Sequence, residues 1–97
     1  DLLARRLEAI AERHGLSTRG RGMMRGIDVG SGEIAAVITS AAFDRGLIIE
    51  TSGAHDEIVK VLAPLTTTDD QLEQGLTILA ECTCEAFASP ALCVAAE

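Results

Sequence analysis

A pair of short apolar segments on either side of a polar turn limits the fold of this chain more than any other feature. The segments are Gly46–Glu50 and Ile58–Ala63, and the turn between them contains Gly53. Such an arrangement predicts a β-hairpin or two neighbouring strands. Pro64 then ends the second strand, because proline has no N–H for the ladder. The chain must therefore form a small sheet and bury one face of it.

Lys60, the only lysine of the chain, lies in the middle of the second predicted strand. Side chains alternate along a strand, so Lys60 shares a face with Ile58 and Leu62, whereas Val59 and Val61 share the other face. A lone cation between apolar neighbours either lies in solvent at a sheet edge or meets an anion, in an ion pair or by binding a carboxylate. The residues alone leave these alternatives open.

A further strand is predicted at Met24–Val29, entered through the glycines of Arg19–Gly22. A dinucleotide-binding loop is also rich in glycine, as is the segment that contains Gly20, Gly22 and Gly26. That site needs a strand, a glycine-rich turn and a helix in this order, and here a strand follows the glycines. The pattern therefore disfavours phosphate binding.

Apolar residues at helical spacing predict helices before and after this strand. The first helix runs from Leu3 to His14, and Gly15 provides its left-handed C-terminal cap. The second helix follows Ser31 as its N-cap and stops at Gly46.

A third helix is predicted to begin at a capping box, with Thr68 as N-cap and Gln71 as the reciprocal partner, and to end near Phe87. Residues 88–97 form a tail of small residues broken by Pro90, which we expect to be loosely held. The order helix, strand, helix, strand, strand, helix predicts a small α/β (α+β-like) domain, with a mostly antiparallel sheet and helices packed on one face.

Composition limits the possible partners and the compartment. A net charge of −7 disfavours nucleic acid and anionic membranes, because both would repel the chain. The three cysteines, Cys82, Cys84 and Cys93, are an odd number near one end, which favours reduced thiols and a cytoplasmic location over a disulfide framework. Because the chain starts with Asp1 inside a helical pattern, we expect it to be a fragment of a longer protein.

No group of residues predicts self-contained catalysis. His14 and His55 each lack a neighbour at ligand spacing, which favours a surface or capping role. Cys82 and Cys84 lie two positions apart on a predicted helix and point to different faces, so they cannot share a metal. We predict no catalytic, cofactor-binding or metal-binding residue within this chain.

Three motifs resemble a known family. They are R-G-R-G-M-M-R-G-I-D at Arg19–Asp28, G-L-I-I-E-T-S-G at Gly46–Gly53 and V-K-V-L-A-P-L-T at Val59–Thr66. In order and spacing they resemble the C-terminal part of class III aminotransferases, the class that includes enzymes of ornithine and GABA metabolism. The R-G-x-G start of the first motif and the A-P-L-T end of the third are general to the class, whereas G-L-I-I-E-T-S-G followed by Val59-Lys60 is more specific.

The resemblance implies that residues 1–87 are the C-terminal small domain of a pyridoxal-phosphate enzyme of fold type I. It implies transfer of the amino group of glutamate to the aldehyde carbon of aspartate 4-semialdehyde. Pyridoxal phosphate and its Schiff-base lysine would then belong to a large domain of the same chain, and the whole enzyme would form a homo-oligomer. The 97 residues alone are expected to be inactive.

Within this resemblance, Lys60 is the residue expected to contact a substrate carboxylate, with Thr51 and Ser52 as weaker hydroxyl-bearing candidates. Many relatives carry an arginine at this place. The guanidinium of arginine can bind a carboxylate with two parallel hydrogen bonds, whereas the ammonium group of lysine cannot. Two alternatives stay open. One is a class III aminotransferase acting on another ω-amino acid, and the other is an independent ligand-sensing or interaction module.

Overall fold

The computed structural model describes residues 2–21, 24–62 and 67–87. These residues form three helices and a four-stranded sheet. The elements are α1 (Leu2–Arg13), β1 (Ser17–Arg21), β2 (Met24–Asp28), α2 (Gly32–Asp44), β3 (Glu50–Ser52), β4 (Ile58–Leu62) and α3 (Asp69–Ala86).

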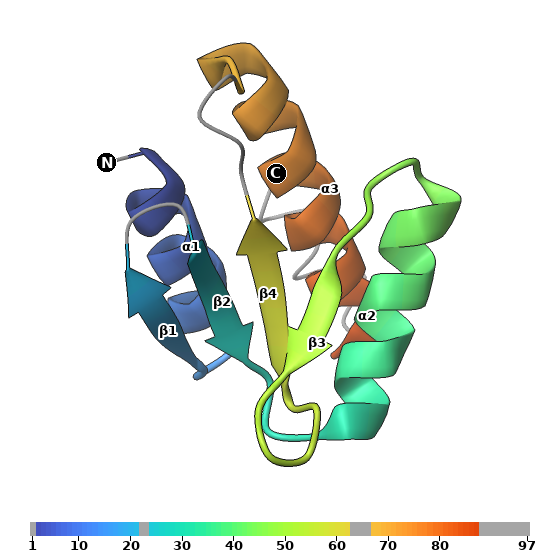
Figure 1. Ribbon diagram of the computed structural model, residues 1–97. Helices are drawn as coiled ribbons and strands as arrows, with labels where there is room; N and C mark the ends of the chain where they lie inside the picture. Colours follow the sequence, from blue (N-terminus) through green and yellow to red (C-terminus); the bar gives the residue numbers. More distant parts are fainter. Residues whose placement is uncertain (1, 22–23, 63–66, 88–97) are drawn as a thin grey trace.

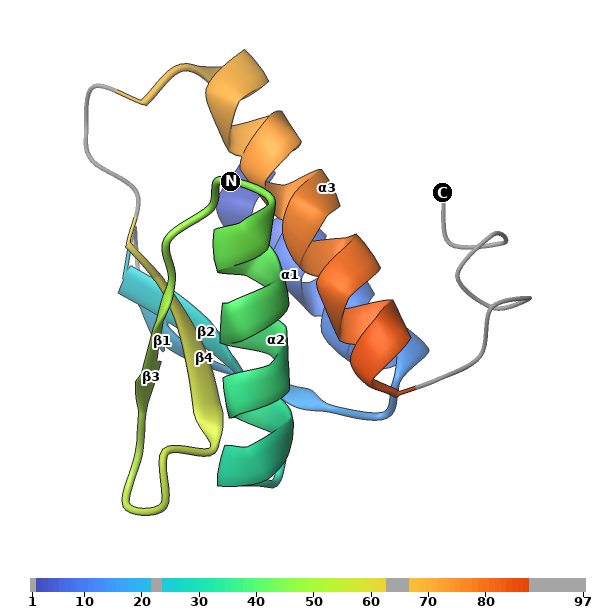
Figure 2. The same ribbon diagram turned by 90° about the vertical axis from the view of Figure 1, so that its right-hand side faces the viewer.

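The strands follow the order β1-β2-β4-β3, and each pair is antiparallel. All three helices lie on the same side of the sheet, which leaves its other side without a helix (Figures 1 and 2). This arrangement confirms the predicted small domain with an antiparallel sheet and helices on one face.

The core lies between the sheet and the helix layer. Ile27 and Val59 lie opposite each other on β2 and β4, and both are almost completely buried. The helices contribute further buried aliphatic side chains, namely Leu3, Leu7, Ile10, Ile38, Leu76 and Leu79. Because these side chains recur at helical spacing, each helix packs one face on the sheet or on a neighbouring helix.

The predicted helix ends are confirmed. Ser31 caps α2 by accepting hydrogen bonds from the backbone N–H groups of Glu33 and Ile34. Thr68 and Gln71 form the reciprocal bonds of a capping box, with distances of 3.1 Å and 3.0 Å. Each cap satisfies backbone donors that a helix start leaves without an internal partner.

The first strand of the predicted hairpin begins later than expected. Gly46 has a φ of +86° and ends α2, and the next N–H, of Leu47, donates to the carbonyl of Ala42. This bond ties the chain to the end of the helix, so pairing with β4 starts only at Glu50. The prediction of a strand at Gly46–Glu50 was therefore wrong in position, although its hairpin with Ile58–Leu62 is confirmed.

The sequence pattern also missed β1. The segment before Met24 was expected to be a glycine-rich entry, but Ser17–Arg21 pairs with Met24–Asp28 along its whole length. This edge strand contains glycine, which is depleted in strands, and it has no apolar residue whose alternation would predict a strand. Ala63, Pro64 and the tail at 88–97 lie outside the described residues.

Gly26 allows β2 and β4 to approach each other closely. A Cβ atom at this position would lie 2.6 Å from the carbonyl oxygen of Val59 and 2.8 Å from Cγ2 of Ile58. We expect Gly26→Ala to lower the free energy of unfolding by about 1–3 kcal/mol, because the neighbouring backbone must shift. Urea denaturation of the 97-residue chain measures this loss.

Gly75 on α3 provides a control of opposite sign. A Cβ atom there would lie 3.5 Å from the nearest side-chain atom, Cδ1 of Leu47, which is an ordinary contact. Gly75→Ala should therefore stabilise the chain by about 0.5–1 kcal/mol through helix propensity. Equal effects of the two substitutions would contradict the close approach at Gly26.

Candidate functional site

One face of the sheet carries no helix (Figure 2). The strand registers place several charged residues on that face. Residues directly opposite each other in paired strands project to the same side of a sheet. Ile27 and Val59 face the core, so the residues that alternate with them lie on the other side, here called the uncovered face. Its members among the described residues are Ser17, Arg19, Arg21, Met24, Gly26, Asp28, Glu50, Ser52, Ile58 and Lys60.

Lys60 lies at the centre of this face. It belongs to β4, which is an inner strand, and its opposite neighbours are Gly26 on β2 and Glu50 on β3. The side chain is half-buried, and no hydrogen bond or ion pair joins its ammonium group to another described residue. The alternative of an edge position was therefore wrong, and the ammonium group is available to an external anion.

Arg19 lies in the same row of the sheet as Lys60, on the far side of Gly26. Its Nη2 atom lies 3.3 Å from Oδ2 of Asp28, and Oδ1 of Asp28 accepts a hydrogen bond from the backbone N–H of Gly30 at 2.9 Å. Sequence reasoning missed this ion pair because it missed β1. The alternation of Ser17, Arg19 and Arg21 was the signal that could have revealed it.

The other two predicted substrate-binding residues lie on β3 and point in opposite directions. Ser52 pairs with Ile58 and shares the uncovered face with Lys60, to which it is a diagonal neighbour. Thr51 pairs with Val59 and points toward the helix layer. The fold thus brings Lys60 and Ser52 together and separates Thr51 from them, while substrate binding by all three stays a prediction.

His55 lies on the surface, as expected, whereas His14 is partly buried against a neighbouring ring. His14 follows α1, and its ring stacks on Phe87 at the end of α3 with a centroid distance of 5.2 Å. Partial burial, followed by the positive charge of Arg13, lowers the pKa of His14 below its ordinary value of 6.5. His55 is exposed in the loop between β3 and β4.

This lowered pKa predicts how stability depends on pH. A histidine that is harder to protonate in the folded state stabilises the fold above the unfolded value of 6.5, and this contribution is lost as the pH falls below it. We expect a smaller free energy of unfolding at pH 5.5 than at pH 7.5. His14→Gln should reduce the difference, as measured by urea denaturation at both pH values.

Cys82 lies buried between α2 and α3 and is a free thiol. Arg45 donates a hydrogen bond from Nη1 to its Sγ atom at 2.8 Å, and Nη2 of Arg45 contacts both carboxylate oxygens of Glu85. Burial raises the pKa of Cys82, which keeps the thiol protonated and a poor nucleophile at neutral pH. Arg45 therefore joins the C-terminal ends of α2 and α3, and the protonated thiol of Cys82 is not a reactive group.

The expectation of reduced thiols fails at Cys84, which is disulfide-bonded. Cys82 and Cys84 lie two positions apart on α3 and so face different surroundings, and Cys82 meets Arg45. Cys93 lies outside the described residues.

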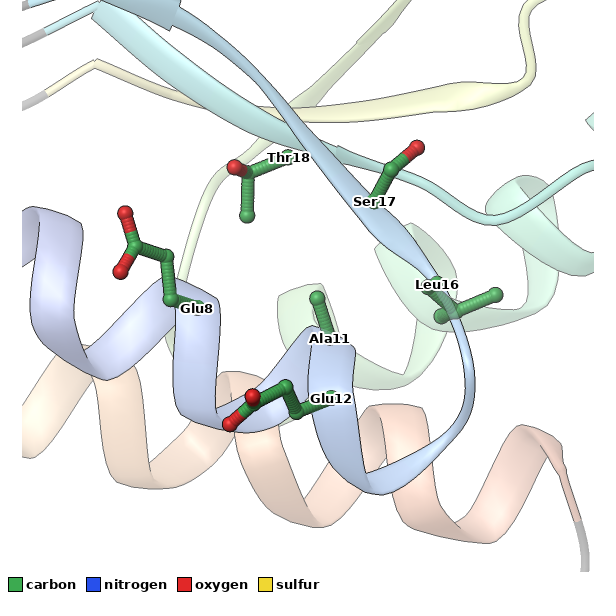
Figure 3. Close-up of a pocket in the computed structure, with 6 residues that line it drawn as sticks. All are labelled: Glu8, Ala11, Glu12, Leu16, Ser17 and Thr18. Carbon is green, nitrogen blue, oxygen red and sulfur yellow. The ribbon is translucent and has the colours of Figure 1, made fainter.

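A hollow of about 300 Å³ lies between α1 and β1 (Figure 3). Its lining includes the carboxylates of Glu8 and Glu12 and the hydroxyls of Ser17 and Thr18. Two carboxylates would repel the phosphate of a cofactor and the carboxylate of an amino acid. This hollow is therefore a poor candidate for the site, and the uncovered face is the better one.

Across residues 2–21, 24–62 and 67–87, no three side chains of His, Cys, Asp or Glu gather closely enough to hold a metal ion. Within the same ranges, no helix combines the length and apolar character needed to cross a membrane.

Comparison with known proteins points to one family. The model of the family "Aminotransferase class-III" matches residues 1–83. The chain is 62% identical over 71 residues to diaminobutyrate–2-oxoglutarate transaminase of Halomonas elongata, covering 73% of this chain and 17% of that protein. It is 57% identical over 65 residues to the enzyme of the same name from Nocardia farcinica, covering 67% of this chain and 15% of that protein.

A third relative has a less specific name. The uncharacterized aminotransferase y4qG of Sinorhizobium fredii is 44% identical over 81 residues, covering 80% of this chain and 18% of that protein. The chain therefore spans less than a fifth of the length of these relatives.

Proposed function

This chain belongs to the class-III aminotransferases, and we propose that it forms the small C-terminal domain of a diaminobutyrate–2-oxoglutarate transaminase. The single observation that carries this proposal is the 62% identity to the Halomonas elongata enzyme of that name. The proposed reaction moves the amino group of glutamate to the aldehyde carbon of aspartate 4-semialdehyde. Its products are 2,4-diaminobutyrate and 2-oxoglutarate.

Pyridoxal phosphate is the proposed cofactor of the whole enzyme, where it would act as the electron sink for amino transfer. The residues described here do not fit it. Lys60, the only lysine, projects from an open sheet face rather than into a pocket, and the hollow beside α1 is lined by Glu8 and Glu12. The cofactor and its Schiff-base lysine are therefore proposed to belong to a large domain of the same chain.

The uncovered face is proposed to turn toward that large domain and the substrate. Its charges support this orientation, because it carries three cations and two carboxylates, whereas the whole chain has a net charge of −7. Lys60 is proposed to bind the substrate carboxylate by a charge-assisted hydrogen bond, with Ser52 as a neighbouring hydroxyl donor. Met24 also lies on this face and is 63% exposed, as expected of a surface that packs against another domain.

Assembly and location are further proposals. Val37 and Phe43 on the outer side of α2 are more than half exposed, which supports contacts in a homo-oligomer. The free thiol of Cys82 supports a cytoplasmic location, whereas the disulfide at Cys84 counts against it. Size-exclusion chromatography and cell fractionation of the whole enzyme test these two proposals.

The reaction is tested with a full-length enzyme that contains this segment. With pyridoxal phosphate, glutamate and aspartate 4-semialdehyde, we expect 2,4-diaminobutyrate as the main product and no turnover by the 97-residue segment alone. The rival to this proposal is a class III enzyme that acts on another ω-amino substrate. A higher kcat/KM with ornithine or 4-aminobutyrate than with 2,4-diaminobutyrate would support the rival and overturn the proposal.

A further inference from the structure

A carboxylate and an ammonium group are direct neighbours on the uncovered face. Glu50 on β3 is paired in register with Lys60 on β4, and both side chains project to this face. Directly opposite residues of an antiparallel pair have Cβ atoms about 5 Å apart. One small molecule can therefore contact both charges at once.

These two charges do not satisfy each other. Opposite charges in such positions attract, yet no hydrogen bond or ion pair joins the Glu50 carboxylate to Lys60 or to any other residue that the structure describes. The other described carboxylate of this face, Asp28, is engaged by Nη2 of Arg19 at 3.3 Å and by the backbone N–H of Gly30 at 2.9 Å. Glu50 is thus the carboxylate of the described uncovered face that is available to an external cation.

Glu50 also lies where a ligand can reach it. It is the first residue of β3, an edge strand of the sheet, and its side chain is exposed. Ser52 follows two positions later on the same face. Together with Lys60, these side chains offer one positive, one negative and one neutral hydrogen-bonding group, which suits a ligand that carries an ammonium group and a carboxylate close together.

The two substrates of the proposed reaction differ at the end that does not react. Glutamate gives up its α-amino group, and the far end of the molecule is a carboxylate alone. Aspartate 4-semialdehyde reacts at its aldehyde carbon, and its far end carries an ammonium group and a carboxylate on the same carbon. Its product, 2,4-diaminobutyrate, keeps this end. A cation alone would bind both far ends but would not distinguish 2,4-diaminobutyrate from 4-aminobutyrate, which lacks the second amino group.

We propose that Glu50 determines the specificity for the amino-group acceptor by binding the ammonium group at its non-reacting end, while Lys60 binds the carboxylate on the same carbon. This inference rests on the proposed function and on the proposed binding of a substrate carboxylate by Lys60. Glutamate and 4-aminobutyrate place a carboxylate near Lys60 without this ammonium group, so they gain nothing from Glu50. The substrate class of the acceptor side is therefore a molecule with an intact α-amino acid group opposite its reacting carbon.

The test uses the full-length holoenzyme and three amino donors, namely 2,4-diaminobutyrate, 4-aminobutyrate and glutamate. The change in cofactor absorbance gives kcat/KM for each half-reaction in the wild type, Glu50→Gln, Glu50→Asp and Lys60→Ala. Asp44→Asn is the matched control, because it removes the same charge from an exposed residue at the end of α2, on the helix side of the sheet. The absorbance before addition of donor checks that the cofactor site is intact.

We expect Glu50→Gln to lower kcat/KM for 2,4-diaminobutyrate about 10- to 100-fold, as for the loss of a charged hydrogen bond. The values for 4-aminobutyrate and glutamate should be unchanged or higher, because neither donor presents an ammonium group to Glu50. Glu50→Asp keeps the charge and should retain more activity with 2,4-diaminobutyrate than Glu50→Gln does. Lys60→Ala should lower the values for all three donors, since each has a carboxylate at its non-reacting end.

The inference and the proposed function fail separately. If the wild type prefers 2,4-diaminobutyrate to 4-aminobutyrate and Glu50→Gln keeps this preference, Glu50 does not determine specificity, and the proposed function stands. Equal losses for all three donors in Glu50→Gln, or the same loss in Asp44→Asn, would reveal a general effect of structure or charge and would also overturn the inference. A wild-type preference for 4-aminobutyrate would overturn the proposed function itself.

Discussion

In the full-length enzyme, Lys60→Ala is expected to lower kcat/KM for glutamate about 100-fold, which corresponds to roughly 2.7 kcal/mol of transition-state stabilisation. The ammonium group is half-buried on an inner strand and unpaired within the described residues. Its removal would abolish the charged hydrogen bond that we propose it makes to the substrate carboxylate. The loss should appear in every half-reaction that uses a carboxylate substrate.

Two observations make this experiment decisive. The absorbance of bound pyridoxal phosphate should be unchanged in Lys60→Ala, because the cofactor is proposed to bind to a large domain of the full-length enzyme. Lys60→Arg keeps the positive charge and should retain most of the activity. Wild-type kinetics in the alanine variant would make Lys60 a structural residue of the sheet.

Leu7→Ala is expected to lower the free energy of unfolding of the 97-residue chain by about 3 kcal/mol, within the usual range of 2–5 kcal/mol for buried leucines. Leu7 is completely buried on α1, a helix that packs against α3, β1 and β2. Its truncation leaves a cavity that these rigid neighbours cannot fill. For a domain of this size the loss is a large part of the total stability.

Urea denaturation measures this effect, with two controls from the same helix. Leu7→Met conserves volume and should cost less than about 1.5 kcal/mol. Glu8→Ala changes the exposed neighbour and should stay within about 0.5 kcal/mol of the wild type. A loss below 1 kcal/mol in Leu7→Ala would show that the core around α1 is loosely packed.

The helices could be predicted from the sequence because their signals are local. Ser31, Gly46 and the pair Thr68 and Gln71 act within one turn of the residues that they cap, so their chemistry can be recognised without knowledge of the fold. The alternation in β4 was equally informative, since Val59 is buried and Lys60 is not.

The strands at the two edges were harder to predict because pairing across the sheet defines them. Ser17–Arg21 has few strand-forming residues and depends on β2 for its extended form. Glu50–Ser52 starts where the end of α2 releases the chain, which the apolar run Gly46–Glu50 does not reveal. Consequently the sequence predicted Lys60 as a candidate but not the row of charges in which it lies.

The position of Lys60 on an inner strand ties its proposed contact with the substrate carboxylate to the register of β4. β4 is paired on both sides, so its register against β2 does not depend on the loop that joins it to β3. Insertions in the exposed loop near His55 can therefore change the surface beside the uncovered face without moving the ammonium group of Lys60. A single deletion within Ile58–Leu62 would instead exchange the two faces, burying the cation and exposing the core valines. Variation among relatives should accordingly be free in the loop and forbidden in the length of this strand.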